Sequence, residues 1–74
     1  MITIKVCRES SGNPIKGSRV ALATKGITGG MYGPEYTNSD GEVHFETGSI
    51  NADVFVDGSC VHSGHLSGRV VVYI

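Results

Sequence analysis

The sequence predicts an all-β domain in which about six or seven short strands pack as a sandwich. Three observations lead to this prediction. Apolar residues recur at every second position along most of the chain, which is the period of a strand with one buried face. Turn sequences rich in glycine separate these stretches at short intervals. No stretch combines the helical period of about 3.6 residues with helix-capping residues.

The length of the chain predicts one domain. It has 74 residues, so we expect residues 1–74 to form a single sandwich. Hydrophobic residues make up 39% of the sequence, which suffices for a packed core and argues against disorder. A chain of this size buries only about 60–65% of its unfolded surface, so little material is left for a deep active-site cleft.

The segment between the first two alternating stretches has the composition of a chain reversal. Gly12 supplies a positive φ and Pro14 a preset one. Ile15 can then return an apolar side chain to the core, and Gly17 permits a bend or bulge before the second strand. We therefore expect a turn that feeds directly into a strand.

Two later turns contain the Asp-Gly pair, a strong hairpin signal. Asp40-Gly41 precedes the alternating EVHFET, and Asp57-Gly58 follows the alternating ADVFV. We expect a hairpin at each pair. The strands are predicted at residues 2–7, 18–25, 35–37, 42–47, 51–57, 60–66 and 68–74.

The last segment, GRVVVYI at residues 68–74, is apolar at nearly every position and has one charge, on Arg69. A bare edge of this composition would aggregate. We therefore expect this strand to be central in its sheet or covered by another chain, which indicates an edge-to-edge oligomer or a docked partner.

Three segments in order, GNPIKGSRVAL, YTNSDGEVHFET and ADVFVDG, resemble the carboxypeptidase-regulatory-like, transthyretin-like group of β-sandwich modules. Those modules typically read G-x-P-[VI]-x-G-[AS]-x-V-x-L, then T-[DN]-x-x-G-x-[FVY]-x-F, then a strand of V-x-V-x-G type. The resemblance spans residues 2–58. It implies a Greek-key sandwich of about six or seven strands, transthyretin-like or Ig-like, and an accessory role in folding, docking or spacing.

Enzyme activity is not expected. One enzyme branch of the transthyretin-like fold hydrolyses 5-hydroxyisourate and ends in a Tyr-Arg-Gly-Ser tail, whereas this sequence ends in Val-Val-Val-Tyr-Ile. A thiol nucleophile at Cys60 would need a base within hydrogen-bond reach. On one strand the Cβ atoms of Cys60 and His62 are roughly 6–7 Å apart, which is too far for an unassisted bond.

Charge and targeting signals exclude several partners. The net charge is -1, from six basic and seven acidic residues, and no window contains a cluster of Lys and Arg. We therefore expect binding neither to nucleic acid nor to an anionic membrane. No apolar run is long enough to span a bilayer. The N-terminal MITIKV lacks the pattern of a secretory signal, which favours a cytoplasmic location.

Cys7 and Cys60 are the two cysteines. The favoured interpretation is two free thiols in a reducing compartment. The alternative is a single bridge in an exported protein.

Residues 26–36 (GITGGMYGPEY) contain four glycines in eight positions and are expected to form a flexible loop. Met31, Tyr32 and Tyr36 lie on this segment outside the alternating pattern. Methionine and aromatic side chains on a mobile loop are typical of protein recognition. The alternative is that Tyr32 or Tyr36 folds back as a lid over one end of the sandwich.

Four residues are candidates for a zinc or copper site: Cys60, His62, His65 and His44. Cys60 and His62 are two positions apart, so on a regular strand they face the same way. If the strand with His44 is adjacent to theirs, three ligands converge. The usual spacing of zinc ligands is missing. The alternative is solvent-facing histidines with Cys60 buried as a small apolar residue.

These observations favour a non-catalytic binding or structural module without a cofactor. It would engage a protein partner, or a second copy of itself, through residues 26–36 or a sheet edge. The competing interpretation is a small metal-binding protein.

Overall fold

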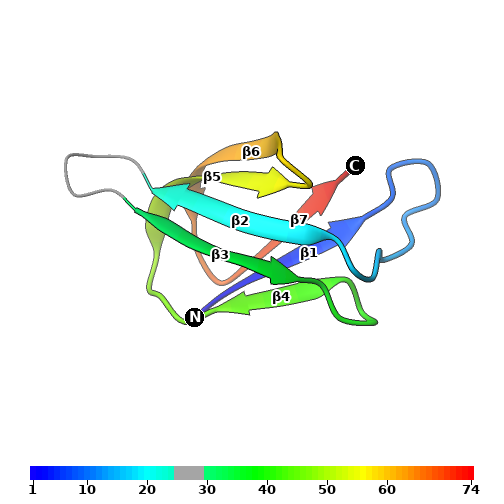
Figure 1. Ribbon diagram of the computed structural model, residues 1–74, viewed down its shortest axis with the longest axis horizontal. Coiled ribbons are helices and arrows are strands. Elements are labelled where there is room, and N and C mark those ends of the chain that lie inside the picture. Colours follow the sequence, from blue (N-terminus) through cyan, green and yellow to red (C-terminus); the bar gives the residue numbers. More distant parts are fainter. Residues whose placement is uncertain (25–29) are drawn as a thin grey trace.

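The computed structural model describes residues 1–24 and 30–74. They form an all-β sandwich of two packed sheets, which confirms the predicted fold class (Figure 1). The strands are β1 (Ile2–Cys7), β2 (Arg19–Thr24), β3 (Met31–Tyr36), β4 (Glu42–Phe45), β5 (Ile50–Val56), β6 (Ser59–Leu66) and β7 (Arg69–Tyr73). Within the described ranges, no helix is long and apolar enough to cross a membrane.

One sheet has three strands in the order β4-β1-β7, and the other has four in the order β3-β2-β5-β6. β1 is antiparallel to β4 and parallel to β7. In the four-stranded sheet every neighbouring pair is antiparallel. Figure 1 shows the four-stranded sheet in front of the three-stranded one, so its outer face is turned toward the viewer.

The core lies between the sheets and is built from alternate residues of the strands. On β1 the buried positions are Ile2, Ile4 and Val6, and on β2 Val20 and Leu22 take the same role. This is the period that the sequence predicts, because successive side chains of a strand point to opposite faces. The buried cluster consists of Ile2, Ile4, Val6, Val20, Leu22, Val43, Phe45, Ala52, Val54, Val56, Leu66 and Val72.

The turn between β1 and β2 has the predicted chemistry. Gly12 and Gly17 have φ values of 76° and 79°, in the left-handed region that favours glycine. Ile15 is partly buried and packs against the core. Its N–H donates to the carbonyl of Val6 at 2.9 Å, which holds the returning chain against β1.

The Asp40-Gly41 turn does not form the predicted hairpin, because it joins β3 and β4, which belong to different sheets. The Asn38 side chain closes it, with Oδ1 accepting the N–H groups of Asp40 at 2.9 Å and Glu42 at 3.1 Å. The carbonyl of Gly41 accepts the N–H of Val6 at 2.8 Å. This bond fixes the turn on β1 and directs the chain into the other sheet.

The Asp57-Gly58 turn does form the predicted hairpin, between β5 and β6. Both residues have positive φ, 51° for Asp57 and 87° for Gly58. Two successive positive φ values are typical of the type I′ turn, whose twist matches that of the two strands of a hairpin.

The C-terminal strand β7 lies at an edge of its sheet, which rules out the first of the two predicted alternatives, a central position. Among the described strands only β1 pairs with it. Val72 faces the core, whereas Val71 is 41% and Tyr73 56% exposed. A covering partner at this edge stays a prediction.

Candidate binding surface

The outer face of the four-stranded sheet has a row of small side chains between larger ones. On β2, Val20 and Leu22 face the core, so Ala21 and Ala23 face outward. The antiparallel register places Ala21 opposite Phe55 of β5, and Ala23 opposite Met31 of β3. Two methyl groups therefore form a low floor between a ring and a thioether.

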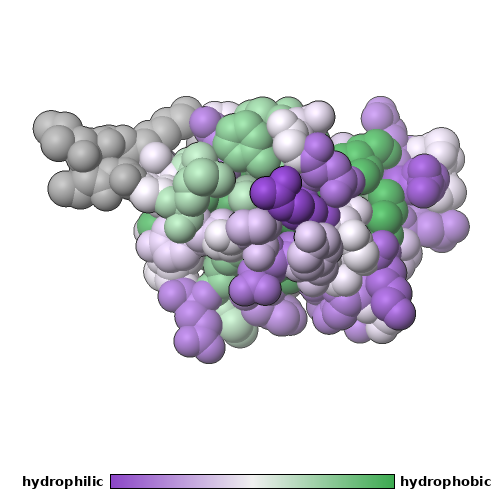
Figure 2. All heavy atoms as spheres, viewed as in Figure 1, coloured by the Kyte–Doolittle hydropathy of each residue, from purple (hydrophilic) through white to green (hydrophobic). Residues whose placement is uncertain are grey.

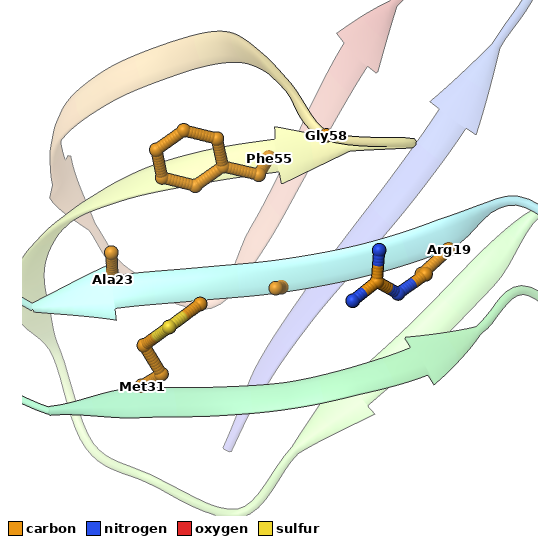
Figure 3. Close-up of a pocket in the computed structure, with 6 residues that line it drawn as sticks. Arg19, Ala23, Met31, Phe55 and Gly58 are labelled. Carbon is orange, nitrogen blue, oxygen red and sulfur yellow. The ribbon is translucent and has the colours of Figure 1, made fainter.

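A hollow of about 260 Å³ lies over this floor. We call it the outer groove. It is lined by Arg19, Ala21, Ala23, Met31, Phe55 and Gly58. In the close-up, the side chains of Met31 and Phe55 stand on the two sides of β2, and the side chain of Arg19 runs back along the strand toward the floor (Figure 3). The groove is thus apolar with one cationic end.

The surface view agrees with this description. Figure 2 shows hydrophobic green atoms over the left parts of β3 and β5, with hydrophilic purple atoms beside them. Met31 is 67% exposed although it lies in a strand. The groove is therefore an apolar surface open to solvent on a face that is otherwise mixed in polarity.

The three residues expected to bind a partner all lie on β3, and they face two directions. Met31 and Tyr36 are opposite Ala23 and Arg19 and share the outer face. Tyr32 is opposite the core residue Leu22, at 36% exposure, and its hydroxyl accepts a hydrogen bond from Thr47 Oγ1 at 3.4 Å. Met31 and Tyr36 are thus available beside the groove, whereas Tyr32 lies on the other face of β3, with its hydroxyl at Thr47.

The prediction of a loop over residues 26–36 is wrong for residues 31–34, which belong to the edge strand β3 together with residues 35 and 36 of the strand predicted at 35–37. A bulge between its partners Val20 and Leu22 absorbs the irregular Gly33-Pro34 segment. Gly33 has a φ of 87°, and a Cβ there would lie 2.9 Å from the carbonyl oxygen of Val20. Residues 26–29 of the predicted loop lie outside the described residues.

The charged groups around the groove differ at its two ends. The backbone N–H of Arg19 donates to Asp57 Oδ1 at 3.1 Å, but its guanidinium has no ion-pair partner among the described residues. At the other end Asp53 pairs with Ala23 across the sheet and accepts a hydrogen bond from Ser63 Oγ at 2.5 Å. Arg19 therefore lines one end of the groove, and Asp53 lies next to Ala23 beyond the other end.

The candidate metal ligands are divided between the two sheets. His44 is on β4 of the three-stranded sheet, where its Nδ1 is hydrogen-bonded to Thr3 Oγ1 at 2.9 Å. Cys60, His62 and His65 are on β6 of the other sheet. In the described part of the chain, no three His, Cys, Asp or Glu side chains are grouped as a metal ion would require.

The expected common orientation of Cys60 and His62 is also wrong. A bulge in the β5–β6 pairing places Cys60 opposite the outward Phe55 and His62 opposite the inward Val54. Cys60 is exposed, whereas Cys7 is buried, and both thiols are free. The expectation that Cys60 is buried as a small apolar residue is therefore wrong, and burial applies to Cys7 instead.

Sequence reasoning missed the groove residues Arg19, Ala21, Ala23 and Phe55. The alternation around Val20 and Leu22 indicates that both alanines face outward, but not which strands flank them. A comparison with protein-family models, curated proteins and solved structures gives no match for this chain.

Proposed function

We propose that this chain is a non-catalytic module that binds a protein partner on the outer face of its four-stranded sheet, along β3 and the outer groove. The observation that carries the proposal is the exposure of Met31 and Tyr36, both 67%, beside an apolar groove. Burying an apolar side chain of this size contributes about 1.5–3 kcal/mol. A partner that covers both residues therefore gains a substantial part of its binding energy.

The composition of this surface suits protein recognition. Methionine adapts its shape to different partners, and tyrosine combines an apolar ring with a hydrogen-bonding hydroxyl. Both types are enriched in protein interfaces relative to the rest of the surface. The two-sheet sandwich is also what the resemblance to carboxypeptidase-regulatory-like modules implies, and an accessory role is usual in that group.

β3 is itself a sheet edge, so residues 31–36 and a sheet edge coincide in one surface. The edge is poorly suited to the addition of a partner strand, because it has a bulge and Pro34 has no N–H to donate. We therefore propose recognition through side chains rather than through backbone pairing.

A peptide library tests the proposal. A random heptapeptide library displayed on phage is selected on the immobilised domain, and the dissociation constant of an enriched peptide is measured by fluorescence anisotropy. In the double variant Met31→Ser/Tyr36→Ser we expect binding to weaken at least about tenfold, since two exposed anchors are lost. The free energy of unfolding should change by no more than about 0.5 kcal/mol per site.

Tyr73→Ser is the matched control, because Tyr73 is a similarly exposed tyrosine, at 56%, on the opposite sheet. It should leave the affinity unchanged. Equal binding by the wild type and the double variant, or equal losses in the double variant and in Tyr73→Ser, would contradict the proposed surface. A double variant that unfolds would show that these side chains belong to the core.

A further inference from the structure

We infer that the outer groove recognises an extended peptide segment in which a bulky aliphatic side chain and a carboxylate lie two positions apart. This inference rests on the proposed function, since it specifies the partner of the same surface. It is carried by three properties of the groove: its volume, its apolar lining and the guanidinium of Arg19 at one end.

The volume indicates a side chain rather than a whole small molecule. The groove holds about 260 Å³. Sites for drug-sized ligands and cofactors enclose roughly 300–1,000 Å³. A shallow hollow below that range, open along a sheet face, suits one or two side chains of a longer segment that continues over the surface.

The lining selects an aliphatic group. The floor consists of the methyl groups of Ala21 and Ala23, and the walls are Met31 and Phe55. None of these side chains presents a hydrogen-bond donor, so a polar group seated on the floor would lose its water without compensation. The thioether of Met31 can adjust to the shape of a branched side chain.

Arg19 supplies a positive charge that can form an ion pair with a carboxylate of the peptide. Its guanidinium has no ion-pair partner among the residues that the structure describes. Figure 3 shows its side chain directed along β2 toward the floor. A guanidinium offers a planar pair of donors that matches the two oxygens of a carboxylate.

The spacing sets the separation of the two peptide residues. Arg19 and Ala21 are two positions apart on one strand face, which corresponds to about 6.6 Å. An extended peptide also repeats on one face every two residues, so an aliphatic side chain over the alanines places the side chain two positions away at Arg19. The acidic residue is thereby placed at the Arg19 end of the groove.

Blocked pentapeptides test the inference. The probes are acetyl-Gly-Leu-Gly-Asp-Gly-amide, the reversed acetyl-Gly-Asp-Gly-Leu-Gly-amide, and variants of each with Asn for Asp, Lys for Asp, or Ala for Leu. Each peptide is added at low salt to the ¹⁵N-labelled domain, up to a peptide concentration of about 10 mM. Backbone amide shifts then measure millimolar dissociation constants. We expect the Asp peptide to bind about five- to tenfold more tightly than the Asn peptide.

Variants of Arg19 test whether the preference for the Asp peptide over the Asn peptide arises in the groove. In Arg19→Gln the Asp and Asn peptides should bind equally, and in Arg19→Glu the Lys peptide should become the better ligand. Arg8→Gln is the matched control, because Arg8 is exposed in the turn after β1, and it should leave the preference intact.

The outcomes separate the inference from the proposed function. If the Leu peptide binds and Met31→Ser weakens it, but Asp and Asn peptides are equivalent, the inference is wrong and the proposed surface stands. If neither Leu nor Met31 matters for peptides that do bind, both are wrong. If no peptide shifts any amide at about 10 mM, the inference is overturned, and the library selection then decides the proposed function by itself.

Discussion

Replacing Gly41 with alanine should lower the free energy of unfolding by about 3 kcal/mol. Gly41 has a φ of 73°, and a Cβ there would lie 2.6 Å from the carbonyl oxygen of Val6 and 2.9 Å from Cβ of Pro14. The left-handed conformation costs a residue with a side chain about 1–2 kcal/mol, and overpacking against rigid neighbours adds about 1–3 kcal/mol. The backbone of β1 cannot retreat, because Val6 N–H bonds the Gly41 carbonyl.

Gly12→Ala is the matched control for this prediction. Gly12 has a similar φ of 76°, but no atom lies within 4 Å of a Cβ built at that position. It should therefore incur only the conformational cost of about 1–2 kcal/mol. Urea unfolding of the two variants measures the difference, and equal losses would show that the close approach at Gly41 contributes nothing.

Val54→Ala should lower the free energy of unfolding by about 2–3 kcal/mol. Val54 is 0% exposed on the central strand β5, in the cluster between the sheets. The substitution removes two methyl groups, each worth about 0.8 kcal/mol of transfer free energy, and leaves a cavity that the packed layers fill only in part. For a chain of this length, with an expected stability of about 4–11 kcal/mol, that is a large fraction.

Val71→Ala makes the same chemical change at a position that is 41% exposed on the edge strand β7. We expect a loss below about 1 kcal/mol there. Thermal and urea unfolding give both values. A loss at Val71 that matches the loss at Val54 would mean that a second copy of the chain buries the β7 edge, and its dependence on protein concentration would confirm that.

The fold could be predicted because its determinants are local. The alternation in β1, β2 and β5 identifies which side chains face the core, since strand geometry converts a period of two directly into a buried face. The Asp57-Gly58 hairpin could also be predicted from the sequence, because its two strands follow each other directly in the chain. The residues of the turns and the period of the apolar side chains therefore sufficed to predict these strands and this hairpin.

The candidate site depends on sheet order, which no local pattern specifies. Ala21 contributes to the groove only because it lies beside Phe55, which is distant in the sequence. The Gly33-Pro34 segment interrupts the alternation, so β3 has the composition of a loop although a bulge keeps it in the sheet. The hairpin prediction for Asp40-Gly41 failed for a similar reason. The turn is held on β1 by the hydrogen bond from the N–H of Val6, which is distant in the sequence.

The central claim is that partners dock on the outer face of the four-stranded sheet. The most direct test is the map of backbone amide shifts when the ¹⁵N-labelled domain is titrated with a peptide enriched from the library. We predict that the largest shifts occur at Ala21, Ala23, Met31 and Phe55 and are absent from β7. Largest shifts at Val71 and Tyr73 instead, on the exposed edge of the other sheet, would contradict it.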